Sequence, residues 1–324
     1  MLRLLSHSVR LVTKAGAEIR KIALSGKLNI VDKSQGLLDY QTEADRLVQR
    51  MIVANLSRKF SKCAIVGEEE LEEDREQDER LLIDEYDQEI LKLDLPNEYK
   101  DVQEEDLTIW VDPLDGTTEF VKGLLEHVTV LVGISYKGRS VAGIVHQPFH
   151  GYGVDNVKTD GQETLDRISK LQGRKIWGLI GLGCFGLERK SLPDDKFIVT
   201  TTASHSNINV EESIASLKPD QVIKVGGAGH KVLLVLEGRA HALVFTSSGC
   251  KRWDTSAPEA LLVASGGQLT DAMGKPIEYV YNDPRGYMNW FGVIASTNQN
   301  QHSKVIEAIP MSVKNRLTEN VAKM

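Results

Sequence analysis

The chain has 324 residues, 41% of them hydrophobic and 26% charged, and a formal net charge of −7. This composition is typical of a folded globular protein of about two domains and excludes a disordered or fibrous one. The excess of acidic residues argues against a nucleic-acid duplex or an anionic membrane as the main partner. It does not exclude a small anionic ligand, because bound cations can reverse the local field.

The cysteines and the first residues bear on where the protein resides. Cys63, Cys184 and Cys250 are far apart and form no CxxC pair, which indicates a reducing compartment. No apolar run is long enough to span a membrane. Residues 1–21 are basic and amphipathic, as in a mitochondrial presequence, but their apolar stripe continues into the following residues. We therefore expect a packed first helix in a cytoplasmic protein that is a monomer or a weak dimer.

Periodicity and turn signals divide the chain into two lobes. In the first lobe we expect helices at residues 1–25, 41–60 and around 81–93, and strands at 64–66, 107–111, 128–136 and 140–147. Residues 151–173, rich in Gly, Asp, Lys and Gln, predict an exposed excursion at the lobe boundary. The second lobe alternates strands near 176–180, 197–201, 222–225, 241–245 and 291–295 with helices near 207–217, 230–236 and 256–265, and a final helix begins near residue 303. We predict an α+β lobe at 1–160 and an α/β lobe at 161–324.

The strand at residues 107–111 ends in an acidic turn. Asp112 follows the strand directly, and Pro113 and Gly116 predict a tight turn that contains Asp115. Two carboxylates that converge in this way suit a hard cation such as Mg²⁺. Gly116 and Thr117 can then open a helix, whose free N–H groups favour a phosphate. The alternative is an acidic turn capped by threonine, but the strand, turn and helix in succession favour a metal site.

Two further acids follow the same logic. Glu68 comes at the end of the strand at 64–66, and Asp254 precedes the helix predicted from residue 256. Asp254 alone reads as a helix N-cap. With Glu68, Asp112 and Asp115 it makes four candidate carboxylates, more than one Mg²⁺ takes from a protein, so the set predicts a two-metal site.

Three other patterns do not carry chemistry. Gly181, Gly183 and Gly186 form a GxGxxG, but a proline closes the following segment too early for a dinucleotide-binding helix, so we expect a tight strand connection. No GxSxG elbow precedes Ser204 and His205, which argues against a hydrolase triad. No histidine pair has the spacing of zinc ligands.

The acidic motifs together resemble a known family. GEE at residues 67–69, WVDPLDGT at 110–117 and WDTSAPE at 253–259 resemble the Mg²⁺-dependent, lithium-sensitive phosphatase superfamily that includes the inositol monophosphatases. Within it, TTTASHSN at 200–207 and VGGAGHK at 225–231 are similar to the 3′(2′),5′-bisphosphate nucleotidases. The resemblance implies a layered αβαβα sandwich with two or three Mg²⁺ ions. It also implies a phosphomonoesterase that removes the 3′-phosphate (or 2′-phosphate) of adenosine 3′,5′-bisphosphate to give AMP, and that acts on 3′-phosphoadenosine 5′-phosphosulfate.

The resemblance also assigns roles to residues. The positions of metal ligands correspond to Glu68, Asp112, the carbonyl of Leu114, Asp115 and Asp254. The pair that activates the attacking water corresponds to Asp45 and Thr117, because a threonine hydroxyl needs a carboxylate to take its proton. The positions that contact the substrate correspond to Gly116, Thr117, Thr202, His205, Gly227 and Lys231. Most metal ligands thus fall in the first lobe, whereas Asp254 and the nucleotide contacts fall in the second.

Some readings stay open. His205 suits a buried structural histidine as well as a ligand contact, and Lys231 suits a solvated surface lysine apart from the glycines before it. His230 stands where the nucleotidases often carry Asn, and the 151–173 excursion is longer than theirs, so substrate preference is less defined than hydrolysis. An inositol polyphosphate 1-phosphatase acting on inositol 1,4-bisphosphate, and a non-catalytic metal or nucleotide sensor of the same fold, are the alternatives.

Overall fold

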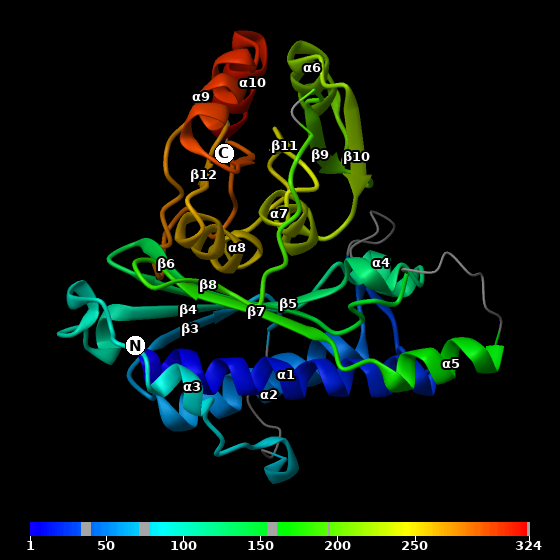
Figure 1. Cartoon of the computed structure of the whole chain (residues 1–324), viewed down its shortest axis with the longest axis vertical. Helices are drawn as coiled ribbons and strands as arrows, with labels where there is room; N and C mark the ends of the chain where they lie inside the picture. The colour runs from blue at the N-terminus through cyan, green and yellow to red at the C-terminus, as the bar shows by residue number, and fades with distance from the viewer. Residues whose placement is uncertain (34–39, 71–77, 154–160, 194, 323–324) are drawn as a thin grey trace.

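The chain folds into five alternating layers of helix and sheet (Figure 1). The computed structural model describes residues 1–33, 40–70, 78–153, 161–193 and 195–322. Helices α1 and α2 cover one face of a six-stranded sheet, and α7 and α8 separate that sheet from a five-stranded one. Helices α6, α9 and α10 cover the far face of the second sheet. Each pair of neighbouring layers encloses apolar side chains, which confirms the predicted αβαβα sandwich.

The six-stranded sheet carries the first half of the site. Its strand order is β3-β4-β5-β6-β7-β8, and only β3 and β4 run parallel. The strands are β3 (Ala64–Gly67), β4 (Leu107–Asp115), β5 (Thr129–Tyr136), β6 (Arg139–Gln147), β7 (Arg174–Leu179) and β8 (Gly183–Phe185). Every residue of β4 is buried because helices cover both faces of this central strand.

One strand predicted for the second lobe belongs to the sheet of the first. The strand predicted near 176–180 is β7, and it pairs antiparallel with β6 from Ala142↔Leu179 to Gln147↔Arg174. The chain therefore returns to the first sheet after the 151–173 segment, of which α5 (Gly161–Lys170) is described and residues 154–160 are not. Of the GxGxxG glycines, Gly181 lies in the short β7–β8 connection, Gly183 begins β8 and Gly186 follows it, which confirms the predicted strand connection. The change from the first sheet to the second falls between β8 and β9.

The outer helices of the first sheet follow their sequence signals. Helix α1 (Leu2–Ser25) buries Leu5, Val9 and Ile19 completely, so the first helix is packed as predicted. It ends at Gly26, whose φ of 66° places it in the left-handed region that glycine tolerates. Helix α2 (Glu43–Lys59) begins at Thr42, whose hydroxyl accepts a hydrogen bond from the Ala44 N–H.

The prediction of one helix around residues 81–93 is wrong. The structure has only a 3₁₀ turn (Glu79–Leu81) and a single helical turn, α3 (Gln88–Leu91). The side chain of Asn55 explains the difference, because its Nδ2 donates to the Leu81 carbonyl and its Oδ1 accepts from the Ile83 N–H. Those backbone groups are satisfied by α2 and need no helix of their own. A two-stranded sheet of β1 (Val31–Asp32) and β2 (Tyr40–Gln41) was also not predicted.

The middle layer depends on two glycines of the first sheet. Helix α8 (Arg252–Ala264) lies across β5 and β6, where a Cβ on Gly143 would come within 2.3 Å of the Ala257 carbonyl oxygen. A Cβ on Gly133 would come within 2.2 Å of the Ser256 hydroxyl oxygen. Only glycine permits this approach, which brings the first turn of α8 over the end of β4.

The second sheet has the strand order β10-β9-β11-β13-β12. Its strands are β9 (Ile198–Thr202), β10 (Gln221–Val225), β11 (Ala242–Phe245), β12 (Gln268–Thr270) and β13 (Val293–Ser296), and its helices are α6 (Ile208–Leu217), α7 (Ala228–Leu236), α9 (Gln299–Ala308) and α10 (Met311–Ala322). Strands β9, β10 and β11 run parallel, so their carboxyl ends point to one edge, which faces the end of β4. In the described residues no helix is long and apolar enough to cross a membrane.

Candidate active site

A bulge at the end of β4 turns two carboxylates toward each other. The predicted tight turn is instead part of the strand: Asp112 pairs with Leu131 and Asp115 with Thr129, so three steps on β4 oppose two on β5. Such a bulge lets side chains that would alternate across the sheet share one side. The Leu114 N–H donates to Asp112 Oδ1 over 3.0 Å, which closes the bulge. Helix α4 (Thr117–Val121) begins two residues after Asp115.

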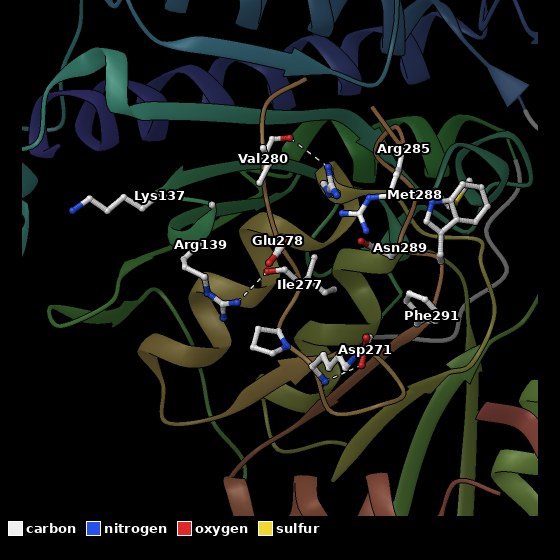
Figure 2. A pocket seen from close by; sticks show the side chains of 16 residues that line it. Lys137, Arg139, Asp271, Ile277, Glu278, Val280, Arg285, Met288, Asn289 and Phe291 are labelled. Atoms are coloured by element: carbon white, nitrogen blue, oxygen red, sulfur yellow. Dashed lines mark hydrogen bonds between the residues drawn. The ribbon is translucent and has the colours of Figure 1, made fainter. Parts of the chain in front are cut away.

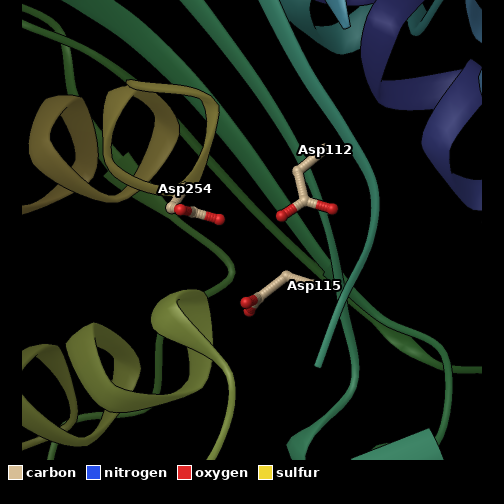
Figure 3. A group of neighbouring side chains, drawn as sticks. All are labelled: Asp112, Asp115 and Asp254. Atoms are coloured by element: carbon tan, nitrogen blue, oxygen red, sulfur yellow. The ribbon is translucent and has the colours of Figure 1, made fainter. Parts of the chain in front are cut away.

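Three aspartates meet between the two sheets (Figure 3). Carboxylate oxygens of Asp112, Asp115 and Asp254 all lie within 4.8 Å of one another. Asp112 and Asp115 come from β4 and Asp254 from the first turn of α8. Glu68 joins them from β3, because its N–H donates to the Val111 carbonyl and so prolongs the parallel pairing with β4. Three of the four predicted carboxylates therefore converge, and Glu68 lies beside them, near enough for its charge to raise the pKa of Asp112.

The position of Asp254 in its helix differs from the prediction. Helix α8 begins at Arg252 rather than Ser256, with Lys251 as its N-cap residue, so Asp254 is the third residue of the helix and Pro258 lies inside it. Asp254 Oδ2 accepts a hydrogen bond of 2.5 Å from the Lys251 N–H. That bond caps the helix and also fixes the direction of the carboxylate.

Burial and mutual repulsion raise the pKa values of Asp112, Glu68 and Asp254. Burial and the charges of Glu68, Asp115 and Asp254 raise the pKa of Asp112 well above its usual range. Burial and the charge of Asp254 raise the pKa of Glu68 to about 8. Burial and the charge of Asp115 raise the pKa of Asp254 to about 6. Buried carboxylates that repel one another in this way fit a site for divalent cations, which would neutralise them and which prefer oxygen ligands.

Asp115 also ties the first sheet to the second. Its Oδ1 accepts from the Ala228 N–H at 2.6 Å, and its Oδ2 accepts from the Gly229 N–H at 2.8 Å and from the Thr129 hydroxyl at 2.6 Å. Helix α7 can approach this closely because residue 229 is a glycine. A Cβ at this position would lie 2.5 Å from the Thr129 hydroxyl oxygen. The N–H groups of Ala228 and Gly229 are thus already used. They are therefore not available to bind a phosphate.

Asp45 and Thr117 meet although 72 residues separate them. The Thr117 hydroxyl lies 3.0 Å from Asp45 Oδ1 and 3.0 Å from the Leu114 carbonyl oxygen. Asp45 is fully buried at the start of α2, where its other oxygen accepts from the N–H and hydroxyl of Thr42. Burial raises the pKa of Asp45 to about 6, against the opposing effect of its hydrogen bonds to Thr42. The predicted carboxylate–hydroxyl pair is therefore assembled.

A pocket of about 340 Å³ opens onto these groups. Nearly all the predicted site residues line it: Glu68, Asp115, Gly116, Thr117, Thr202, His205, Gly227, Lys231 and Asp254. Asp45, Asp112 and Leu114 lie behind this lining and reach it through their contacts. Five polar side chains of the wall were not predicted from the sequence, namely Tyr40, Thr118, Glu119, Ser204 and Lys251. Lys251 could have been found, since it comes two residues before the WDTSAPE motif that contains Asp254.

The two candidate substrate contacts from β9 differ in exposure. Thr202 is 2% exposed, and its hydroxyl accepts from the N–H groups of Ser204 and His205, so it shapes the turn after the strand. His205 is exposed, so its alternative reading as a buried structural histidine is wrong. Its Nδ1 lies 2.8 Å from the Ser204 hydroxyl oxygen, so the two neighbouring side chains are within hydrogen-bond distance.

The neighbouring residues Lys231 and His230 lie in different surroundings. Lys231 lies in the first turn of α7, is 6% exposed and lines the pocket, so the reading as a solvated surface lysine is wrong. His230 is buried and stacks on His127, with ring centroids 4.6 Å apart, and is not part of the pocket wall. Burial and the neighbouring His127 lower the pKa of His230 well below its usual range, so both rings pack as neutral groups at neutral pH.

Comparisons with known proteins agree with this geometry. The profile of the Inositol monophosphatase family matches residues 1–314. A 3′(2′),5′-bisphosphate nucleotidase 1 from Rattus norvegicus is 44% identical over 98% of this chain and 97% of its own. A protein of the same name from Dictyostelium discoideum is 40% identical over 95% of this chain and 96% of its own. In fold, an IMPase from Thermotoga maritima matches 98% of both chains with a TM-score of 0.62 at 22% identity.

Proposed function

The chain belongs to the inositol monophosphatase family, and we propose that it is a Mg²⁺-dependent phosphomonoesterase that removes the 3′-phosphate of adenosine 3′,5′-bisphosphate. One observation carries the proposal: a single pocket brings together the carboxylate cluster, the Thr117 hydroxyl and the Lys231 side chain. The names of the relatives that are 40% and 44% identical supply the substrate class.

The carboxylate cluster supports a metal-dependent reaction. We assign Glu68, Asp112, Asp115, Asp254 and the Leu114 carbonyl as Mg²⁺ ligands, and the number of carboxylates favours two ions. When bound, such ions lower the pKa of a coordinated water and stabilise charge on the leaving oxygen. The Leu114 carbonyl oxygen lies 3.0 Å from the Thr117 hydroxyl, and because it has two lone pairs, one is available to an ion even when Thr117 donates to it. Asp115 likewise keeps its hydrogen bonds to α7 and Thr129. Its Oδ2 already accepts two of them, whereas Oδ1 accepts one and keeps a lone pair for an ion.

Asp45 and Thr117 supply the proton path. The hydroxyl hydrogen of Thr117 can point to Asp45 Oδ1, which leaves the oxygen of Thr117 free to accept a proton from a water in the pocket. Thr42 holds Asp45 with two hydrogen bonds, so the carboxylate does not turn away when Thr117 moves its proton. With a pKa of about 6, Asp45 is mostly ionised at neutral pH and able to take that proton.

Lys231 supports recognition of a second anionic group. The residue is 6% exposed and lines the pocket, and within the described part of the chain its ammonium makes no hydrogen bond or ion pair. A cation that is largely enclosed by protein and faces the pocket without a partner favours an anionic group of the ligand. We assign this group as the 5′-phosphate of the nucleotide, with Thr202, His205 and the backbone at Gly116 and Gly227 as the remaining contacts.

A phosphate-release panel tests the proposal. Purified protein with Mg²⁺ is expected to release phosphate from adenosine 3′,5′-bisphosphate, and from 3′-phosphoadenosine 5′-phosphosulfate at a comparable or lower rate. Millimolar Li⁺ is expected to inhibit, since it can occupy a Mg²⁺ position with less charge. Turnover of inositol 1,4-bisphosphate without turnover of either nucleotide would instead support an inositol phosphatase. Tight binding of the nucleotide without any release would support a non-catalytic sensor.

A further inference from the structure

A second and larger cavity, of about 580 Å³, lies beside the first turn of α8 (Figure 2). Its wall consists of the β5–β6 turn at Lys137 to Arg139, Arg252 of α8, and parts of the segment 271–292. None of the proposed metal ligands or substrate contacts lines it. Apolar side chains of Val280, Met288, Trp290 and Phe291 form part of the same wall.

Positive charge is concentrated in this cavity, although the chain is acidic overall. Its wall holds five cationic side chains, Lys137, Arg139, Arg252, Lys275 and Arg285, against two acidic ones, Asp271 and Glu278. Arg252 and Arg285 donate to the same oxygen of Asp283, at 2.6 Å and 3.0 Å. One carboxylate cannot neutralise two guanidinium groups, so positive charge remains beside the cavity.

The other cations are also incompletely compensated. Arg139 is about half exposed and lies 3.5 Å from Glu259. Burial raises the pKa of Glu259 to about 7, so its negative charge is only partly present at neutral pH. The ammonium of the exposed Lys275 makes no hydrogen bond or ion pair within the described part of the chain. A cavity with excess cations and an apolar wall suits an organic anion.

We propose that this cavity is a second binding site, distinct from the active site, for a small phosphorylated molecule with an apolar group. Its phosphate is held by the Arg252 and Arg285 guanidinium groups, and its apolar group packs against Trp290. Arg252 is 6% exposed and fixed by Asp283, so it presents its donors without reorganising. This site does not depend on the proposed nucleotidase activity.

The wall of the cavity is hydrogen-bonded to the first turn of α8. Asn289 Nδ2 donates to the Lys251 carbonyl at 3.0 Å and lies 3.1 Å from the Thr255 hydroxyl oxygen. The Arg252 N–H donates to the Tyr287 carbonyl at 2.8 Å. Because Asp254 belongs to this same turn, an anion bound at Arg252 is coupled to the carboxylate cluster through the helix.

The test uses ¹⁵N signals of the tryptophan indoles in the full-length, Mg²⁺-loaded protein. Trp290 reports on the cavity and Trp253, next to Asp254, reports on the first turn of α8; Trp290→Phe assigns the first signal. Phenylphosphonate, a non-hydrolysable organic anion, is expected to shift both signals with saturation. Benzyl alcohol, which carries the ring without the charge, is the matched ligand and is expected to shift neither.

Variants locate the effect. Arg285→Gln is expected to weaken the Trp290 response about tenfold, as for loss of one charge-assisted hydrogen bond. Lys275→Glu, which alters no contact of Asp283, is expected to weaken it as well, whereas the exposed Lys304→Glu on α9 leaves it unchanged. Lys231→Gln in the active site also leaves it unchanged. An absent Trp290 shift, an equal response to benzyl alcohol, or unaltered affinity in both cavity variants would overturn the proposal.

Discussion

The half of the pocket built by β4 and α4 is held differently from the half built by β9 and α7. In the first half, Asp112, Asp115 and Asp45 are buried, and each accepts hydrogen bonds that fix its direction. In the second half, His205 is exposed and the ammonium of Lys231 has no partner in the described part of the chain. The groups proposed for chemistry are therefore preorganised, whereas those proposed for recognition are completed by the ligand.

The largest effect is expected at the centre of the first half. Asp112→Asn removes a proposed metal ligand, and we expect kcat to fall by roughly a thousandfold, the size typical of a lost electrostatic contact to the transition state. In the absence of metal the same change relieves repulsion among the acids, so the melting temperature is expected to rise. Steady-state phosphate release and thermal unfolding in EDTA measure the two quantities. Near-normal kcat would contradict the metal-ligand assignment.

A smaller loss is expected at the proton path. Thr117→Ala removes the hydroxyl that contacts Asp45, and we expect kcat to fall by roughly a hundredfold, within the range for general acid–base groups. Thr117→Ser keeps the hydroxyl and is expected to restore most of the activity. If serine failed to rescue while the protein remained folded, the methyl group rather than the hydroxyl would be the important part of Thr117.

The second half of the pocket is expected to affect binding more than turnover. Lys231→Gln should raise KM for adenosine 3′,5′-bisphosphate about tenfold or more, as for loss of a charge-assisted hydrogen bond, with a smaller change in kcat. Adenosine 3′-monophosphate, which lacks the 5′-phosphate, is the matched substrate. Wild type and variant are expected to have similar KM values for it. A tenfold difference there too would mean that Lys231 does not recognise the 5′-phosphate.

The smallest effect concerns α8, which contributes to both halves. Glu259 is buried on α8, and its Oε2 accepts from the Tyr279 hydroxyl at 2.5 Å. Burial raises its pKa from 4.5 to about 7, so the folded state favours the protonated form. The stability that Glu259 contributes is full below about pH 4.5 and is lost as the pH rises to 7.

Glu259→Gln keeps the shape and the bond to Tyr279 but cannot ionise. We expect the difference in free energy of unfolding, variant minus wild type, to increase as the pH rises from 4.5 to 7. Urea unfolding at several pH values measures the difference, with kcat at neutral pH as the control that should stay unchanged. A difference that is independent of pH would show that Glu259 does not bind its proton more tightly in the folded state.

The same contrast explains what could be predicted from the sequence. Glu68 directly follows β3, and Asp112 and Asp115 lie in the last four residues of β4, so strand periodicity is enough to place all three near one edge of a sheet. The bulge at Asp112 and Asp115 was missed because Pro113 and Gly116 also signal a turn, and only pairing with β5 decides between the two. Asp254 was placed before its helix because Pro258 suggested a first turn. The capping contact with the Lys251 N–H sets the start four residues earlier.

The second half was harder to predict because its residues depend on contacts between the lobes. The sequence does not show that the N–H groups of Ala228 and Gly229 bind Asp115, a partner 113 and 114 residues away. His230 replaces the Asn common in the nucleotidases, which predicts an effect on substrate preference. In the structure its ring stacks on His127 and lies outside the pocket wall. Local sequence patterns carry no information about such long-range partners.

The most direct test of the central claim is to follow adenosine 3′,5′-bisphosphate by ³¹P NMR with the protein, with and without Mg²⁺. We predict that, with Mg²⁺ present, the 3′-phosphate signal is replaced by that of inorganic phosphate. The 5′-phosphate signal keeps its intensity and moves to the position of AMP. We predict no conversion without Mg²⁺ or with Asp112→Asn. Loss of the 5′-phosphate signal, or equal conversion without any divalent cation, would contradict the account.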